Sequence, residues 1–145
     1  MGMSVRFSLF FLVVVFILNG CGSAKYGRDA LLSKEIGEYY KAIERYRKAT
    51  RKEKDRAKRV IYAFQTAECY RYIGDYERAE LYYKNALRRG YADNIAILQH
   101  ADMLRATQQY EASIESYRTY LDSVPGDEHA LAGLESIRRR ALLEA

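Results

Sequence analysis

Residues 74–86 have the sequence Gly-Asp-Tyr-Glu-Arg-Ala-Glu-Leu-Tyr-Tyr-Lys-Asn-Ala, and this stretch decides the fold of the chain. Within it, Tyr76, Ala79, Tyr83 and Ala86 follow one another at intervals of three, four and three residues. This spacing places the four side chains on one face of an α-helix, where large and small groups alternate. The stretch therefore predicts a helix with one closely packed face.

The same pattern occurs once upstream and once downstream. The matching residues are Tyr39, Ala42, Tyr46 and Ala49 before the stretch, and Tyr110, Ser113, Tyr117 and Tyr120 after it, where Ser113 and Tyr120 depart from the alanines of the other copies. The first residues of the three copies are separated by 37 and 34 residues. A repeat of about 34 residues that contains two helices is the tetratricopeptide period. The pattern therefore predicts a tandem array of helical hairpins.

Over roughly residues 24–143 the chain resembles tetratricopeptide repeat (TPR) proteins. In that family a small residue on the first helix of each hairpin packs against a small residue on the second. The corresponding residues are Ala30, Ala67 and Ala101 on first helices, and Ala42, Ala79 and Ser113 on second helices. The turn glycine is present as Gly37 and Gly74 but is replaced by Gln108, and the closing proline occurs only as Pro125. The resemblance implies an all-α fold, an α-solenoid of about three TPR hairpins.

The predicted TPR domain spans residues 29–143, with units at about 24–56, 57–92 and 93–126 and a capping helix at 127–143. The expected helices are 29–36, 39–59, 60–73, 76–89, 94–106, 110–121 and 128–142, where Gly90 closes one helix and Asp93 caps the next. A solenoid has to cover its last apolar face. We therefore expect the inner stripe of the last helix to consist of Leu131, Leu134, Ile137 and Ala141.

Composition limits the chain to one domain, because it has 145 residues, 49% of them hydrophobic, and a single proline. The net charge of +5 is compatible with anionic lipid, acidic protein surfaces or nucleic acid as a partner, and is also ordinary for a soluble domain. Nine Lys or Arg lie between Arg45 and Arg59, against Glu53 and Asp55. This segment is either a solvated helical face or a patch that faces phosphate groups.

Residues 1–20 have the features of a signal peptide, since Arg6 precedes the short apolar run from Phe7 to Leu18. The following Leu18-Asn19-Gly20-Cys21 resembles a bacterial lipobox, which implies lipidation of Cys21 and a tether over residues 21–28. The residue after the cysteine is Gly22 and not Asp, and in this the chain resembles lipoproteins of the outer membrane. We therefore expect the protein to be anchored at the periplasmic face of the outer membrane. The alternatives are an ordinary signal peptide and an uncleaved anchor that happens to contain a cysteine.

The repeat region contains few side chains of the kinds that enzymes use for catalysis. Cys69 and His100 fall at helix positions where core packing is the usual explanation, and a nucleophile and base would need mutual contact. No metal-ligand spacing, phosphate loop or nucleophile motif is present in the sequence. We therefore expect no enzyme activity, no cofactor and no metal. Nucleic acid is disfavoured because helical periodicity places most tyrosines in the core and because export separates the chain from nucleic acid.

The TPR resemblance implies that the first helix of each unit lines a groove for a peptide or protein. The groove positions of the family correspond to Lys34 in the first unit, to Phe64, Glu68 and Arg71 in the second, and to Leu98, Asp102 and Arg105 in the third. Glu68 and Arg71 are three residues apart, and so are Asp102 and Arg105. Each acid either pairs with the arginine on its own helix, or Lys34, Arg71 and Arg105 form a row of donors to an extended partner.

A lipobox, an early TPR and the segment 125–135 together resemble the N-terminal part of OmpA-family lipoproteins of Bacteroidota, including the PorE-like component associated with type IX secretion. The resemblance implies a membrane-tethered adaptor for protein partners in an envelope or secretion assembly. One alternative is an N-terminal fragment of a longer, peptidoglycan-linked lipoprotein. Another is a structural element that binds an anionic membrane surface or associates with itself.

Overall fold

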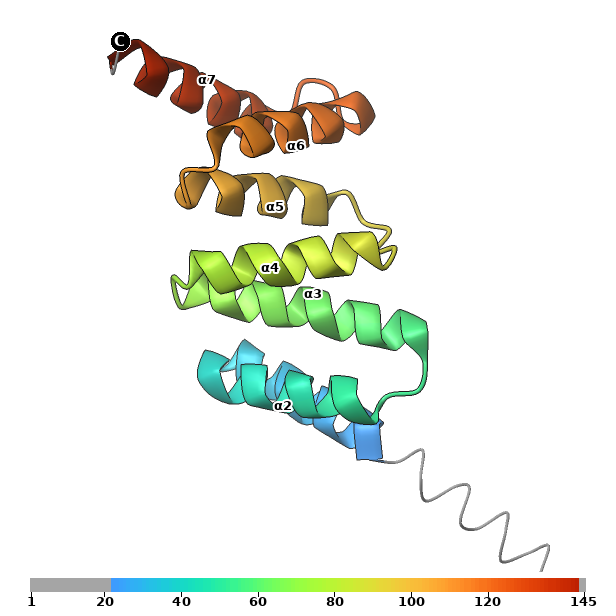
Figure 1. The fold of residues 1–145 in the computed structure, drawn as a ribbon. Coiled ribbons are helices and arrows are strands. Elements are labelled where there is room, and N and C mark those ends of the chain that lie inside the picture. The colour runs from blue at the N-terminus through green and yellow to red at the C-terminus, as the bar shows by residue number, and fades with distance from the viewer. Residues whose placement is uncertain (1–21, 144–145) are drawn as a thin grey trace, which may run out of the picture.

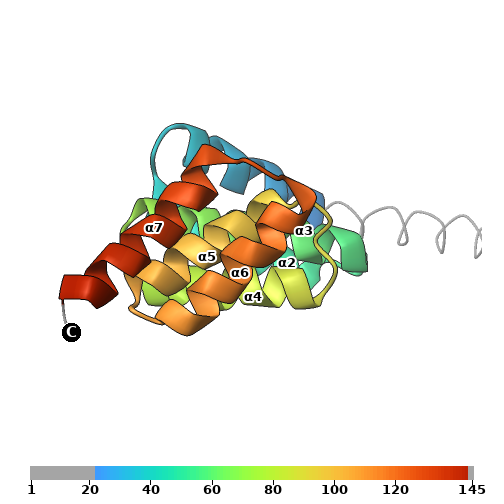
Figure 2. The ribbon, with the colours of Figure 1, turned by 90° about the horizontal axis from the view of Figure 1, so that it is seen from above.

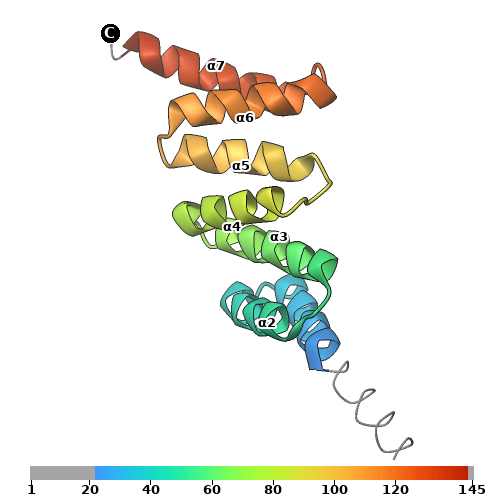
Figure 3. The ribbon, with the colours of Figure 1, turned by 45° about the vertical axis from the view of Figure 1, so that its right-hand side comes forward.

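A computed structural model of the chain describes residues 22–143, and in this range every regular element is a helix. An N-terminal helix over residues 22–35 precedes six further helices. These are α2 (Tyr39–Lys52), α3 (Arg56–Tyr72), α4 (Tyr76–Arg88), α5 (Ile95–Ala106), α6 (Tyr110–Ser123) and α7 (Glu128–Leu143). Successive helices pack side by side in a single stack that ends in α7 (Figures 1 and 3). The predicted all-α solenoid of helical hairpins is confirmed.

The predicted signal peptide and Cys21 lie outside the described residues. None of the helices within residues 22–143 is both long enough and apolar enough to cross a membrane.

The small residues lie where the helices of each hairpin meet. Ala30, Ala67 and Ala101 on the first helices are all 0% exposed, and so are Ala42, Ala79 and Ser113 on the second. Ser113 replaces an alanine without leaving a buried hydroxyl unpaired, because its Oγ donates to the backbone oxygen of Ala101 at 2.8 Å. This packing confirms the helix pairing predicted from the repeat.

The large residues of the repeat differ in burial. Tyr46, Tyr83 and Tyr117, the second aromatic of each copy, are at most 2% exposed. By contrast Tyr76, the first aromatic of its copy, is 43% exposed. Tyr39 stacks on Tyr72 with ring centroids 4.9 Å apart. The first aromatic starts its helix beside the turn, where fewer neighbours cover it, so the core depends on the second one.

The turns inside the three hairpins share one geometry. Gly74 has a φ of 77° and Gln108 a φ of 62°, both in the left-handed region. In each turn the next amide returns to a carbonyl five residues earlier, from Asp75 to Tyr70 at 3.0 Å and from Gln109 to Leu104 at 2.8 Å. Gln108 therefore occupies a position at which a side chain is strained.

Two helix boundaries differ from those expected. The N-terminal helix already includes residue 22, rather than beginning at about 29. Helix α2 ends at Lys52 instead of continuing to Arg59, since the Glu53 carboxylate accepts from the amides of Lys54 and Asp55 at 2.9 and 3.0 Å. Asp55 then caps α3 by accepting from the Ala57 amide at 2.8 Å. The segment 53–59, which was expected at the end of α2, therefore forms the link between the two helices and the first turn of α3.

The predicted inner stripe of α7 is wrong in part. Ile137 is 5% exposed as expected, but Leu131 is 48% exposed and Ala141 is exposed as well. The buried face instead contains Ala130 and Gly133. Gly133 approaches Tyr117 so closely that a Cβ there would lie 2.4 Å from the tyrosine Cζ. Because Gly133 faces Tyr117, α7 is rotated about its axis relative to the expected orientation. It lies across the end of the stack over α5 and α6 (Figure 2).

Candidate functional site

The predicted groove residues lie on the first helix of each hairpin, where Phe64, Leu98 and Asp102 are buried and Lys34, Glu68, Arg71 and Arg105 are partly exposed. Phe64 and Leu98 are only 7% and 6% exposed. Phe64 is covered by Tyr91, whose ring stacks on it with centroids 4.3 Å apart. The two apolar residues therefore form the floor beneath this face, while the polar residues reach its surface.

On α3, Glu68 and Arg71 form an ion pair with 3.0 Å between Oε2 and Nη2. The other carboxylate oxygen of Glu68 accepts a short hydrogen bond from the hydroxyl of Tyr83 on α4. The Nε atom of Arg71 is buried and lacks a hydrogen-bond acceptor within residues 22–143. Glu68 thus joins the two helices of its hairpin, and Arg71 keeps one donor unused there.

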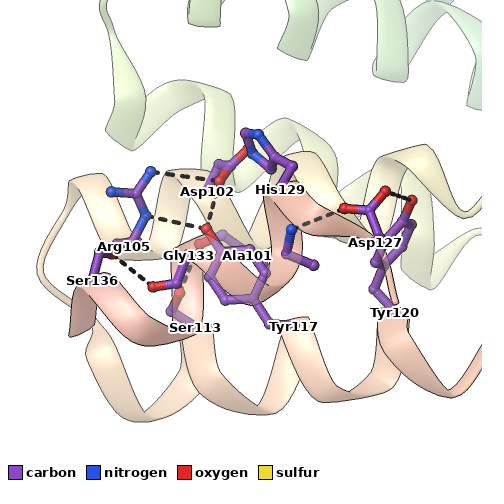
Figure 4. Close-up of polar contacts among 11 residues, drawn as sticks. Ala101, Asp102, Arg105, Ser113, Tyr117, Tyr120, Asp127, His129, Gly133 and Ser136 are labelled. Carbon is purple, nitrogen blue, oxygen red and sulfur yellow. Dashed lines mark hydrogen bonds and ion pairs between the residues drawn. The ribbon is translucent and has the colours of Figure 1, made fainter. Parts of the chain in front are cut away.

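On α5, Asp102 occupies the place of Glu68 and has three partners (Figure 4). The Tyr117 hydroxyl donates to Oδ1 at 2.5 Å, and Arg105 Nη2 lies 3.6 Å from the same oxygen. Arg105 Nε donates to the Tyr117 hydroxyl at 3.1 Å. The third partner is His129 of α7, whose Nε2 is 2.7 Å from Oδ2. This cluster therefore connects three helices around one buried carboxylate.

The two clusters repeat one arrangement, in which an acid on the first helix binds a tyrosine 15 residues later on the second. Burial raises the pKa of Tyr117 to about 12, and its hydrogen bond to Asp102 acts in the same direction. Burial likewise raises the pKa of Tyr83, with Glu68 as the second cause. Both phenols therefore stay protonated at neutral pH and donate to the carboxylates.

Sequence analysis did not assign Tyr83, Tyr117 or His129 to the site. A signal for the tyrosines was present, because the acid and the tyrosine have the same separation in both units. The helical period of the aromatic residues indicates packing, and it carries no information about their hydroxyl groups. For His129 the sequence carries no comparable signal, since only the rotation of α7 brings its ring to Asp102.

The first unit lacks this cluster. Leu31 stands at the acid position and is 46% exposed. Lys34, at the basic position, donates from Nζ to Oε1 of Gln65 on α3 at 2.7 Å. Lys34 therefore lies beside the second unit and brings its positive charge to the same face as Arg71.

One exposed isoleucine lies one helical turn before the buried apolar residue on each of α3 and α5. Ile61 lies three residues before Phe64 and is 47% exposed, and Ile95 lies three residues before Leu98 and is 36% exposed. Beside Ile61 there is a cavity of about 710 Å³, to which Val60 and Tyr91 also contribute. We call the surface made by Lys34, Ile61, Arg71, Ile95 and Arg105 the first-helix face.

Cys69 and His100 do not form a nucleophile–base pair in the part of the chain that the structure describes. Cys69 is fully buried, and burial raises the pKa of its thiol to about 11. The His100 ring instead has its Nε2 atom 3.0 Å from the Glu80 carboxylate of α4. Within residues 22–143 no group of His, Cys, Asp or Glu side chains is arranged to hold a metal ion.

No known family model and no curated protein matches the sequence. Solved structures do match the fold. The first TPR of Spaghetti (RPAP3), bound to the HSP90 peptide SRMEEVD, has a TM-score of 0.72 at 17% identity, over 83% of this chain and 94% of that one. The fold is that of a TPR domain.

Two further TPR structures have the same architecture. The Arabidopsis OM64 TPR domain has a TM-score of 0.70 at 16% identity, over 84% of this chain and 98% of that one. The second TPR domain of human RPAP3, in complex with the HSP70 peptide SGPTIEEVD, has a TM-score of 0.70 at 19% identity, over 83% of this chain and 98% of that one. At 16–19% identity these likenesses show that the chain shares the TPR fold.

Proposed function

We propose that this TPR domain is an adaptor that binds an extended, acidic segment of a protein partner on the first-helix face. The observation that carries the proposal is the asymmetry of its two ion pairs. The side chain of Arg71 is 27% exposed and that of its partner Glu68 12%, while Arg105 is 39% and Asp102 11% exposed. The carboxylates point inward and the guanidinium groups outward, so the surface presents donors.

The hydrogen bonds to the tyrosines explain why the carboxylates do not neutralise this surface. Glu68 and Asp102 share their charge with buried hydroxyl groups as well as with the arginines. Each guanidinium has five N–H donors, of which its carboxylate takes only part. A carboxylate or backbone carbonyl of a partner can accept from the other donors.

The peptides bound by two of the structural neighbours are acidic, opposite in charge to the arginines of the first-helix face. The peptides in the Spaghetti and human RPAP3 structures, SRMEEVD and SGPTIEEVD, both end in Glu-Glu-Val-Asp. These acidic peptides support an acidic ligand class for the arginines of the first-helix face. The exposed Ile61 and Ile95 would contact apolar side chains between the acidic ones.

We infer from the N-terminal sequence that Cys21 carries a lipid and holds the domain at the periplasmic face of a bacterial outer membrane, in an envelope or secretion assembly. The resemblance to PorE-like lipoproteins supports this location. The test is fatty-acid labelling of the full chain, which Cys21→Ser should abolish. Labelling that persists in this variant would reject the tether.

The peptide-binding proposal is tested by site-specific crosslinking in the full chain. A photoreactive residue at position 61 or 95 should trap one common partner, while the same residue at the exposed position 118 of α6 should not. Arg71→Gln and Arg105→Gln together should remove the crosslink without changing helicity. Arg88→Gln and Arg118→Gln make the same change in charge on exposed second-helix positions and should retain it. Equal trapping from all three positions would refute the assignment.

A further inference from the structure

A second concave site lies away from the first-helix face, between α2 and α4. It is a cavity of about 370 Å³ whose lining includes Arg47, Arg51 and Arg89 together with Thr50, Tyr82 and Asn85. Arg47, Thr50 and Arg51 come from α2, and Tyr82 and Asn85 come from α4. Arg89 is the C-cap residue that directly follows α4. The cavity contains none of the five residues that define the first-helix face, although Arg89 also lines the cavity beside Ile61.

The cavity has three guanidinium groups and no carboxylate among its lining residues. Within residues 22–143, none of its arginines forms a side-chain hydrogen bond or an ion pair. Other cations on the same helices are paired, as Lys48 is with Glu44 at 2.6 Å. Arg78 likewise pairs with Asp75. The absence of an acid at the cavity is therefore a local property and does not reflect a shortage of acids in the chain.

Helix stability does not account for this arrangement. Arg51 and Arg89 are near the carbonyl ends of α2 and α4, where a positive charge is favourable. Arg47 is farther from the end of α2 and four residues from Arg51, a spacing at which like charges repel on a helix. Arg47 also acts on Tyr82, where its charge opposes the rise in the phenol pKa that burial and Tyr70 cause. The three charges thus face one space without an internal counter-charge.

We propose that this cavity binds a phosphate group, as the phosphomonoester of a small molecule or of a lipid headgroup. Guanidinium groups hold phosphate oxygens through paired N–H donors. Two guanidinium groups from different helices can therefore enclose one anion. The hydroxyls of Thr50 and Tyr82 and the amide of Asn85 add uncharged donors on the same lining. The anion removes the repulsion between Arg47 and Arg51 and links α2 to α4.

The test uses the full chain in zwitterionic detergent, with inorganic phosphate and glycerol phosphate as probes. The side-chain N–H signals of Arg47, Arg51 and Arg89 in NMR spectra should shift and saturate together. Arg47→Gln, Arg51→Gln and Arg89→Gln combined should weaken binding by about tenfold or more, because several charge-assisted hydrogen bonds are lost. A matched control replaces the exposed Arg88, Arg118 and Arg139 by Gln and should bind as the unaltered chain does.

A second arm identifies the source of the phosphate. The same signals are followed in phosphatidylcholine bicelles with and without phosphatidic acid. Shifts with the soluble probes assign a small-molecule ligand, and shifts only with phosphatidic acid assign a lipid headgroup; both support the site. No saturable shift in either arm, or equal weakening in the control variant, would overturn the proposal. All six arginines are exposed, so helicity measured by circular dichroism should be the same in both variants.

Discussion

The Nε2 atom of His129 lies 2.7 Å from Oδ2 of Asp102, although 27 residues separate them in sequence. Asp102 is 9% exposed and already accepts from Tyr117, so it is the buried centre of the contact between α5, α6 and α7. The side chain of His129 is 58% exposed. The last helix is therefore attached to the solenoid through a polar contact at its start and through Ile137 farther along.

Replacing His129 by Ala should loosen α7 selectively. The lost hydrogen bond is worth about 0.5–1.5 kcal/mol, which corresponds to roughly threefold to tenfold faster amide exchange in α7. Exchange in α3 and α4 should stay unchanged. Hydrogen exchange followed by mass spectrometry measures both regions in one sample. Unchanged exchange in α7 would mean that the other contacts of this helix, among them Ile137 in the core and Arg140 over the ring of Tyr110, hold it without His129.

The tyrosine hydroxyls should contribute to stability where they donate to a carboxylate. Tyr83→Phe and Tyr117→Phe each leave a mostly buried acid with one donor fewer, at a cost of about 1–2 kcal/mol in the free energy of unfolding. Tyr46→Phe is the matched control, because Tyr46 is equally buried but makes no side-chain hydrogen bond within residues 22–143. Urea denaturation measures all three. Equal losses would show that the hydroxyls act only through packing.

Gln108→Gly should stabilise the protein. Gln108 has a φ of 62°, in a region that glycine enters without the steric cost a side chain incurs. After the greater flexibility of glycine in the unfolded chain is subtracted, we expect a gain of about 0.5–1 kcal/mol and a rise in Tm of a few degrees. The converse change, Gly74→Gln at a φ of 77°, should lower the Tm. A decrease in Tm for Gln108→Gly would indicate that the glutamine side chain makes a compensating contact.

His100 should make the protein less stable in mild acid. Burial lowers the pKa of His100 below its ordinary value of 6.5, and the hydrogen bond to Glu80 opposes this only in part. The unfolded chain then binds the proton more readily, so the free energy of unfolding decreases as the pH falls below about 6.5. Above that pH this contribution is constant. His100→Gln should remove it, and the difference between the two pH profiles isolates it from the carboxylates. Parallel profiles would contradict the prediction.

Much of the site could be predicted from the sequence because helical spacing alone sets which residues share a helix face. The pairing of Glu68 with Arg71, and of Asp102 with Arg105, follows from their separation of three residues. The boundary near residue 53 could not be predicted in this way, because it depends on one carboxylate that captures two following amides. The exposed ends of the arginines could not be predicted either, since their direction depends on the tyrosines of the next helix.

The repeat, the pairing of helices through small residues and the buried tyrosines can all be predicted from local sequence. These follow from the local period of 3.6 residues per turn and from side-chain size, which every hairpin contains within its own segment. Only the tertiary structure decided the rotation of α7, the contact of His129 with Asp102, and the meeting of Arg47, Arg51 and Arg89 around one cavity. These relationships join segments that are far apart in the chain. Their geometry depends on how closely one helix approaches another, as Gly133 approaches Tyr117, and no local pattern encodes that distance.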